Sequence, residues 1–256
     1  MAARRPDGRD LGVLRLVEIV PGFHRMAEGS VLYRAGSTVV LCTASVDEKV
    51  PPWMEGKGKG WITAEYQMHP RSNPVRRENR DGRGKAPSGR TQEIQRLIGR
   101  ALRAAVDLDK LGERQITIDC DVLEADGGTR TASITGGFVA LLLALAKIAK
   151  AGQKGAFTTP VVREPVAAVS VGLVNGDLAL DLVYLEDSKA EVDLNLVATR
   201  SGAIIEVQGT AEGAPVPRSE IQRMIDLGLV GIETLVQAQQ NALASAGVDL
   251  SALLMK

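Results

Sequence analysis

The stretch from Asp126 to Gly137 carries the residue types that bind an anion. It reads Asp-Gly-Gly-Thr-Arg-Thr-Ala-Ser-Ile-Thr-Gly-Gly, so four glycines allow close backbone approach, and four hydroxyls and one arginine supply donors. A strand pattern precedes this glycine loop and an apolar helix follows it, which predicts free N–H groups at a helix N-terminus. The motif is neither a Walker loop nor a dinucleotide fingerprint. Two interpretations stay open: the loop binds phosphate, or it is a turn whose Arg130 pairs with a carboxylate such as Asp126.

A second cluster runs from Tyr184 to Asn195 and contains two aspartates, Asp187 and Asp193. On one continuous strand they would lie roughly 20 Å apart. Two carboxylates that share a cation must come within about 4–5 Å. We therefore expect the chain to turn between them. These residues predict either a site for a divalent cation or a polar hairpin turn with solvated acids.

Residues 71–90 form the most basic segment of a chain that is otherwise balanced, with 31 basic and 31 acidic residues. The segment holds seven basic and two acidic side chains, a net charge of +5. With Pro, Asn, Ser and Gly between these charges, it is predicted to be a mobile loop. It either binds an anionic partner or is a solvated linker. The zero net charge of the whole chain excludes a uniformly basic surface for binding polymers, but not a local patch.

Histidine and cysteine chemistry are poorly supported. His24 and His69 are the only histidines, and neither lies in a nucleophile motif. Cys42 and Cys120 lie in strand patterns and are expected to be buried free thiols. If the chain is an enzyme, its active groups are arginines, backbone amides and carboxylates. Such groups suit phosphoryl transfer with a divalent ion.

The elements that must position these residues follow the order strands, helix, strand, helix, strands, helix. This order predicts an α+β fold with mostly antiparallel or mixed sheets flanked by helices, as one domain of two lobes over residues 1–256. The expected strands are 13–20, 29–34, 37–46, 61–68, 114–123, 166–174, 177–185, 192–199 and 203–209. The expected helices are 91–106, about 133–150, and one that a capping box at Ser219 opens and that runs to about Ala246.

The N-terminal residues show no apolar stretch typical of a signal peptide. The longest apolar run, Phe138 to Ala146, is far shorter than the ~20 residues that span a membrane. We therefore expect a cytoplasmic location without membrane contact.

Several blocks in a fixed order resemble the bacterial ribonuclease PH family, and the resemblance covers nearly the whole chain. The blocks are Arg5–Arg9, Gly60–Tyr66, Pro70–Ser72, Ser88–Ile98, Asp119–Leu123, Asp126–Gly136, Leu185–Ser188 with Asp193, and Ile205–Gly213. The resemblance implies a two-lobed ribonuclease PH-like fold. It also implies a phosphate-dependent 3′→5′ exoribonuclease, a nucleotidyltransferase that trims tRNA precursors.

The family's phosphate site is implied at matching positions of the glycine loop. Gly128, Thr129 and Arg130 are expected to hold inorganic phosphate, the co-substrate, with help from Arg90 and with Ser133 nearby. Arg130 is thereby expected to be a catalytic residue as well.

The resemblance further implies that Asp187 and Asp193 are catalytic and bind the divalent ion, magnesium or manganese. It implies that the arginine-rich loop contacts RNA, with Arg71, Arg76 and Arg77 as candidates. The family assembles as a homo-hexameric ring, a trimer of dimers. We expect Arg90, Arg130 and both aspartates to converge on one pocket.

Two other functions remain as alternatives to phosphorolysis. One is a non-catalytic RNA-binding ring subunit of an exosome-like assembly. The other is a phosphate-loop kinase for a small molecule, although the chain has no nucleotide motif.

Overall fold

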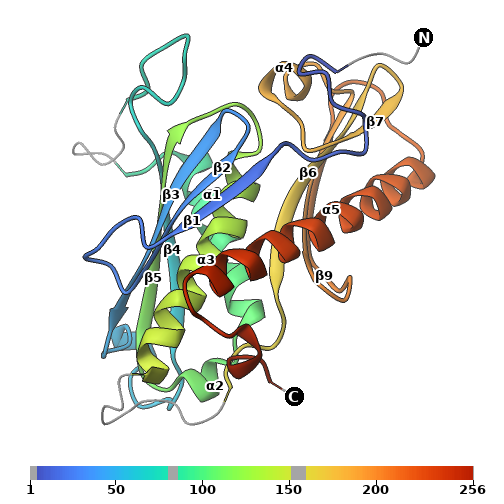
Figure 1. Cartoon of the computed structure of the whole chain (residues 1–256). Coiled ribbons are helices and arrows are strands. Elements are labelled where there is room, and N and C mark those ends of the chain that lie inside the picture. Colours follow the sequence, from blue (N-terminus) through green and yellow to red (C-terminus); the bar gives the residue numbers. More distant parts are fainter. Residues whose placement is uncertain (1–4, 80–85, 151–159, 256) are drawn as a thin grey trace.

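The computed structural model describes residues 5–79, 86–150 and 160–255, and it places a long helix, α3, against two β-sheets (Figure 1). The larger sheet contains β1 (Val17–Pro21), β2 (Gly29–Ala35), β3 (Thr38–Asp47), β4 (Trp61–Met68) and β5 (Gln115–Glu124). The smaller sheet contains β6 (Val166–Val174), β7 (Asp177–Leu180), β8 (Val192–Thr199) and β9 (Ile204–Ala211). The helices are α1 (Gly89–Ala105), α2 (Leu108–Leu111), α3 (Thr129–Lys150), α4 (Tyr184–Asp187) and α5 (Arg218–Ser245), with short 3-10 turns at Pro52–Met54 and Leu250–Ala252.

The larger sheet has the strand order β1-β2-β3-β5-β4. Strands β1, β2 and β3 pair antiparallel, which confirms the predicted meander. Strand β4 pairs parallel with β5, because α1 carries the chain across between them. The smaller sheet has the order β7-β6-β8-β9 and all its pairs are antiparallel. The expected α+β class with mixed sheets is confirmed.

Helix α3 forms the centre of the core. It packs against β2 and β3 of one sheet and against β6 of the other. Length and composition alone would let this helix cross a membrane, but 78% of the apolar window is buried inside the protein, as in a core helix. Because apolar residues from both halves of the chain join one cluster around α3, the two sheets share a core.

Two hairpins follow the predicted turn chemistry. Asn175 and Gly176 both have positive φ, 52° and 80°, as the turn between β6 and β7 requires. Gly202 also has a positive φ, 88°, between β8 and β9. The expectation of free, buried thiols at Cys42 and Cys120 is confirmed, and the two face each other as register partners on β3 and β5.

Four predicted boundaries were wrong. β1 begins at Val17 and not at residue 13, because Leu11 and Arg15 form backbone hydrogen bonds with the other lobe instead of the sheet. β7 ends at Leu180 and not at residue 185, because Tyr184–Asp187 turns into the short helix α4. α3 begins at Thr129, four residues before the expected start, so the hydroxyl-rich segment lies in its first two turns.

The fourth correction concerns the capping box expected at Ser219. Helix α5 begins at Arg218 after Pro217, and no side chain caps it. Pro217 has φ −60°, which already suits entry into a helix, so Ser219 lies inside the first turn.

Candidate active site

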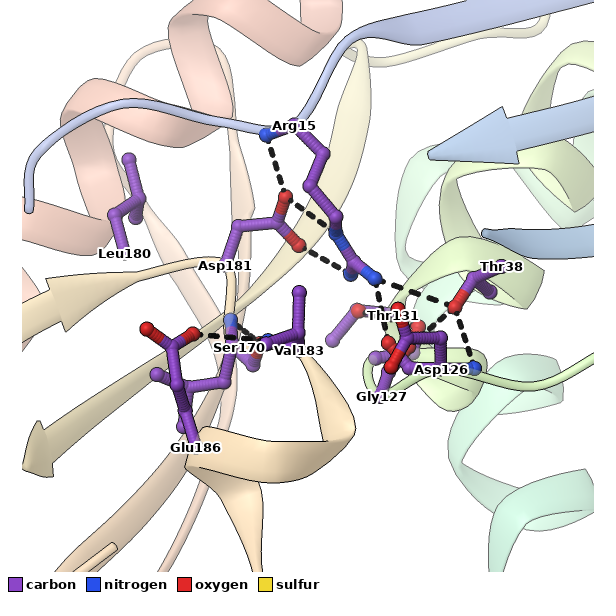
Figure 2. A network of polar contacts seen from close by, with 12 residues as sticks. Arg15, Thr38, Asp126, Gly127, Thr131, Ser170, Leu180, Asp181, Val183 and Glu186 are labelled. Carbon is purple, nitrogen blue, oxygen red and sulfur yellow. Dashed lines mark hydrogen bonds and ion pairs between the residues drawn. The ribbon is translucent and has the colours of Figure 1, made fainter. Parts of the chain in front are cut away.

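The glycine loop between β5 and α3 has three carbonyl groups that accept hydrogen bonds from side chains of the protein. The carbonyl of Asp126 accepts a hydrogen bond of 2.6 Å from Arg15 Nη1, and that of Gly127 accepts one of 2.8 Å from Thr38 Oγ1 (Figure 2). The carbonyl of Gly128 accepts from Thr131 Oγ1 at 2.9 Å, within the first turn of α3. None of these three carbonyls is therefore free to face an anion.

The N–H groups of these peptide units point in the direction opposite to the carbonyl groups. In a trans peptide the C=O of one residue and the N–H of the next point in opposite directions, and the described residues contain no cis bond. The N–H groups of Gly127, Gly128 and Thr129 therefore point away from Arg15, Thr38 and Thr131. Together with the dipole of α3 they supply donors that suit an anion.

Glycine is required at both loop positions by conformation and by space. Gly127 has φ 75° and Gly128 has φ 64°, which L side chains rarely adopt. A β-carbon on Gly127 would meet the carbonyl oxygen of Leu182, and one on Gly128 would lie 3.0 Å from Arg15 Nη2. The loop is thus packed directly against the segment that leads into α4.

Thr129 and Ser133 have different surroundings. The hydroxyl of Thr129 lies 2.9 Å from the hydroxyl of Tyr66, which comes from β4. Ser133 is fully buried, and its hydroxyl donates to the carbonyl of Thr129 at 2.8 Å. Because α3 begins at Thr129, Ser133 lies one turn inside the helix and its hydroxyl is not directed at the loop's outer side.

Arg130 lies near the residues with which it was predicted to converge, and it does not pair with Asp126. Its Nη1 donates to Gln208 Oε1 at 2.7 Å and lies 3.5 Å from Glu93 Oε1. The Asp126 carboxylate instead accepts a hydrogen bond of 3.1 Å from the backbone N–H of Tyr184. Arg130 thus pairs with the carboxylate of Glu93 and not with that of Asp126, and the interpretation of the loop as a turn whose arginine pairs with a carboxylate stays open.

Arg90 lies in the first turn of α1, two residues after the N-cap Ser88. Burial raises the pKa of Asp187 and that of Tyr66, and the positive charges of Arg90 and Arg130 oppose both rises. Both arginines therefore interact electrostatically with Asp187.

The two aspartates lie on either side of a turn, as the distance argument required. Asp187 is the last residue of α4 and Asp193 lies near the start of β8. Burial and the nearby charge of Asp187 raise the pKa of Asp193 to about 6, with Arg130 and a hydrogen bond from Asn195 acting in the opposite sense. The charges of Arg90 and Arg130 act on Asp187, and those of Asp187 and Arg130 act on Asp193, so the four residues are neighbours; their convergence on one pocket stays a prediction.

The aspartate pair fits a divalent cation. Asp193 Oδ1 is buried and has no hydrogen-bond partner among the residues that the structure describes. Those residues contain no group of three or more metal-ligating side chains. Mg²⁺ commonly binds through one or two carboxylates and takes its other ligands from water and substrate phosphates. An unsatisfied carboxylate oxygen beside a second carboxylate therefore suits Mg²⁺ or Mn²⁺.

The arginine-rich loop is anchored at its base beside the glycine loop. His69 N donates to the carbonyl of Val122 at 2.8 Å, and Ala125 N donates to the carbonyl of Ser72 at 3.0 Å. Since Ala125 directly precedes Asp126, this base lies at the entry to the glycine loop.

The candidate RNA contacts on this loop, Arg71, Arg76 and Arg77, are exposed, and Arg76 pairs with Glu78 at 3.0 Å. Part of the predicted positive charge, Arg80, Arg83 and Lys85, lies outside the described residues. The predicted mobility of the loop stays a prediction.

Several residues around this site had no predicted role. Tyr66 contacts Thr129, Gln208 and Glu93 contact Arg130, and Arg15 contacts the glycine loop. Tyr66, Glu93 and Gln208 lie within the quoted blocks, so their positions carried a signal. Arg15 lies outside them and gave none.

Comparisons with known proteins agree with this geometry. The models of the 3′ exoribonuclease family match as domain 1 at residues 13–147 and domain 2 at residues 164–231. The chain is 56% identical to ribonuclease PH of Neisseria meningitidis serogroup C, over 91% of this chain and 95% of that protein. It is 51% identical to ribonuclease PH of Syntrophomonas wolfei, over 93% and 98% of the two chains.

Solved structures share the fold at lower identity. A chain of the Archaeoglobus fulgidus exosome, solved with RNA bound to the active site, superposes with a TM-score of 0.74 at 22% identity, covering 91% of this chain and 92% of that one. Rice (Oryza sativa) Rrp46 gives a TM-score of 0.74 at 17% identity, covering 93% and 100%. With two family domains in order and relatives of this identity along nearly its whole length, the chain belongs to the 3′ exoribonuclease family.

Proposed function

We propose that this chain carries out phosphorolytic 3′→5′ RNA shortening with Arg90, Arg130, Asp187 and Asp193 as its central residues. The activity follows from the family and from the relatives named ribonuclease PH. The observation that supports the residue assignment is that the charges of Arg90 and Arg130 act on the half-buried Asp187, and those of Asp187 and Arg130 act on the half-buried Asp193.

In this proposal, inorganic phosphate lies against the amides of Gly127, Gly128 and Thr129, with the guanidinium groups of Arg90 and Arg130 balancing its charge. A phosphate oxygen attacks the phosphorus of the last phosphodiester in the RNA. The bond from that phosphorus to the 3′-oxygen of the preceding nucleotide breaks, and the 3′-oxygen takes up a proton. The products are a nucleoside 5′-diphosphate and an RNA one nucleotide shorter.

Asp187 and Asp193 would hold Mg²⁺ or Mn²⁺, which would stabilise negative charge on the transferring phosphoryl group and the leaving oxygen. The buried, unpartnered Asp193 Oδ1 supports this assignment. Burial raises the pKa of Asp193 to about 6, and repulsion from the carboxylate of Asp187 adds to that rise.

The substrate we propose is single-stranded RNA at the 3′ end of tRNA precursors, held by the exposed arginines Arg71, Arg76 and Arg77. Arginines that contact phosphodiesters do not read sequence, so an accessible 3′ end would select the substrate. We also propose a homo-hexameric ring, a trimer of dimers, in the cytoplasm. Exposed large apolar side chains within residues 13–26 support burial against another copy.

The test is to incubate the protein with a 3′-extended tRNA precursor and Mg²⁺, with and without inorganic phosphate. Nucleoside diphosphates that form only with phosphate are the expected product. Nucleoside monophosphates would instead indicate hydrolysis, and an unchanged RNA would indicate the non-catalytic ring subunit. Arg130→Ala should raise the phosphate concentration required while RNA binding persists.

A further inference from the structure

Arg15 lies in the segment before β1 and joins the two lobes at the glycine loop. Its side chain is buried, with 6% of the residue exposed. The guanidinium group forms a two-pronged ion pair with Asp181, with Nε at 2.9 Å and Nη2 at 2.6 Å from the two carboxylate oxygens (Figure 2). Its backbone N–H also donates to Asp181, at 2.8 Å. One residue of the first lobe therefore binds one residue of the second lobe at three points.

The third nitrogen of the Arg15 guanidinium group, Nη1, binds the glycine loop. Nη1 donates to the carbonyl of Asp126 at 2.6 Å and lies 3.3 Å from Thr38 Oγ1. Thr38 in turn donates to the carbonyl of Gly127 at 2.8 Å and accepts from the N–H of Asp126 at 3.0 Å. Arg15 and Thr38 thus set the orientation of the two peptide groups whose opposite ends present N–H donors to phosphate.

Hydrogen bonds also connect Asp181 with the helix that carries Asp187. Its backbone has φ 56°, a left-handed conformation that aspartate tolerates better than most residues. Its carbonyl accepts hydrogen bonds of 2.9 Å from both Arg5 and Arg9. Arg5 also pairs with both carboxylate oxygens of Glu186, at 2.8 and 2.7 Å. Glu186 directly precedes Asp187 in α4.

We propose that Arg15 and Asp181 are positioning residues that fix the phosphate-binding loop relative to Asp187, so that the nucleophile and the leaving oxygen are aligned. The proposal rests on the proposed function of the loop. Neither side chain needs to touch a substrate. A planar guanidinium can satisfy a carboxylate and a carbonyl at once in fixed directions, whereas the single ammonium of lysine cannot.

The test compares Arg15→Lys with the wild-type protein and with Arg114→Lys. Arg114 is a matched control, since 5% of it is exposed and it binds the carbonyl of Leu111 at the far end of β5. KM for phosphate, KM for a single-stranded RNA and kcat are measured separately, with melting temperature as the folding readout. Calorimetry measures the affinity for inorganic phosphate in the absence of RNA.

For Arg15→Lys we expect phosphate affinity to fall on the order of 10- to 100-fold, because lysine cannot keep all the charge-assisted hydrogen bonds that orient the loop, and one such bond is worth a factor of about this size. KM for RNA should change little, and Arg114→Lys should keep the phosphate affinity of the wild type. Thr38→Val, which removes no charge, should shift phosphate affinity in the same direction and supplies the test if Arg15→Lys does not fold.

Wild-type phosphate affinity in both Arg15→Lys and Thr38→Val would overturn the proposal. So would an equal loss in Arg114→Lys, since it would reveal only a general effect of stability. If the wild-type protein released no nucleoside diphosphate, the proposed function would fail, and calorimetry with phosphate would still decide the role of Arg15.

Discussion

Gly127→Ala offers a quantitative test of how closely the glycine loop packs against the approach to α4. The added β-carbon would lie 3.0 Å from both Val183 C and Tyr184 N, and nearer still to the carbonyl oxygen of Leu182, whereas ordinary contacts begin at 3.4 Å. All three are backbone atoms, so no side chain can rotate away. The loop or the segment before α4 must therefore move by on the order of 1 Å, which can cost about 100-fold in rate.

A second glycine with nearly the same φ shows the cost of conformational strain alone, without a steric clash. Gly56 has φ 72°, close to the 75° of Gly127, and a β-carbon there would meet nothing within 4 Å. Placing alanine in this left-handed region costs roughly 1–2 kcal/mol at either position. Both variants should thus lose similar stability from strain, but Gly127→Ala alone should lose phosphorolysis.

The assay is kcat/KM for phosphate at saturating RNA, with thermal unfolding of each variant measured in parallel. We expect Gly127→Ala to lose about 100-fold, equivalent to about 2.7 kcal/mol of transition-state stabilisation, and Gly56→Ala to stay near the wild type. If the two variants had the same kcat/KM, the packing of the loop against α4 would not control the reaction, and the reasoning would be refuted.

Three further substitutions test separate parts of the site. Asp193→Asn should raise the melting temperature without divalent ions and abolish phosphorolysis. Burial raises the pKa of this carboxyl from 3.8 to about 6, so its contribution to stability is lost as the pH rises through that range. Calorimetry should show that the melting temperature of Asp193→Asn exceeds that of the wild type by less as the pH falls below about 6. A difference in melting temperature that does not change with pH would contradict this. Tyr66→Phe removes a partner at 2.9 Å from Thr129 and should raise KM for phosphate by about 3- to 10-fold, so an unchanged KM would count against that contact. A double substitution of Arg76 and Arg77 by alanine should weaken RNA binding and reduce its salt dependence by about 1–2 in the log–log slope, with KM for phosphate unchanged; an unaltered slope would exclude these arginines as phosphodiester contacts.

Strands were the part of the fold best predicted from sequence. The structure reproduces the expected bounds of β4, β6 and β8, because alternation and turn residues such as Asn175-Gly176 are local signals. The four residues of α4 are too few to show a helical period. That helix is held by Arg5, which binds Glu186 from 181 positions away, and no local pattern reveals such a pair.

The site was predictable where chemistry constrained the chain locally. The distance between Asp187 and Asp193 on a strand required a turn, and the structure has one. The start of α3 was misplaced because glycines and hydroxyls favour loops, whereas here the hydroxyl of Thr131 and the guanidinium of Arg15 fix the first turn and the residues before it. The pairing of Arg15 with Asp181 depends on the tertiary fold and had no counterpart in sequence spacing.

The buried ion pairs of Arg5 and Arg15 also determine when the site can form during synthesis of the chain. Their partners lie 181 residues later for the Arg5–Glu186 pair and 166 residues later for the Arg15–Asp181 pair. Domains form from the N-terminus as the chain leaves the ribosome, and contacts this distant must wait for their second partner. A nascent chain therefore carries the glycine loop long before the residues that orient it. RNA-degrading activity should arise only once most of the polypeptide has emerged.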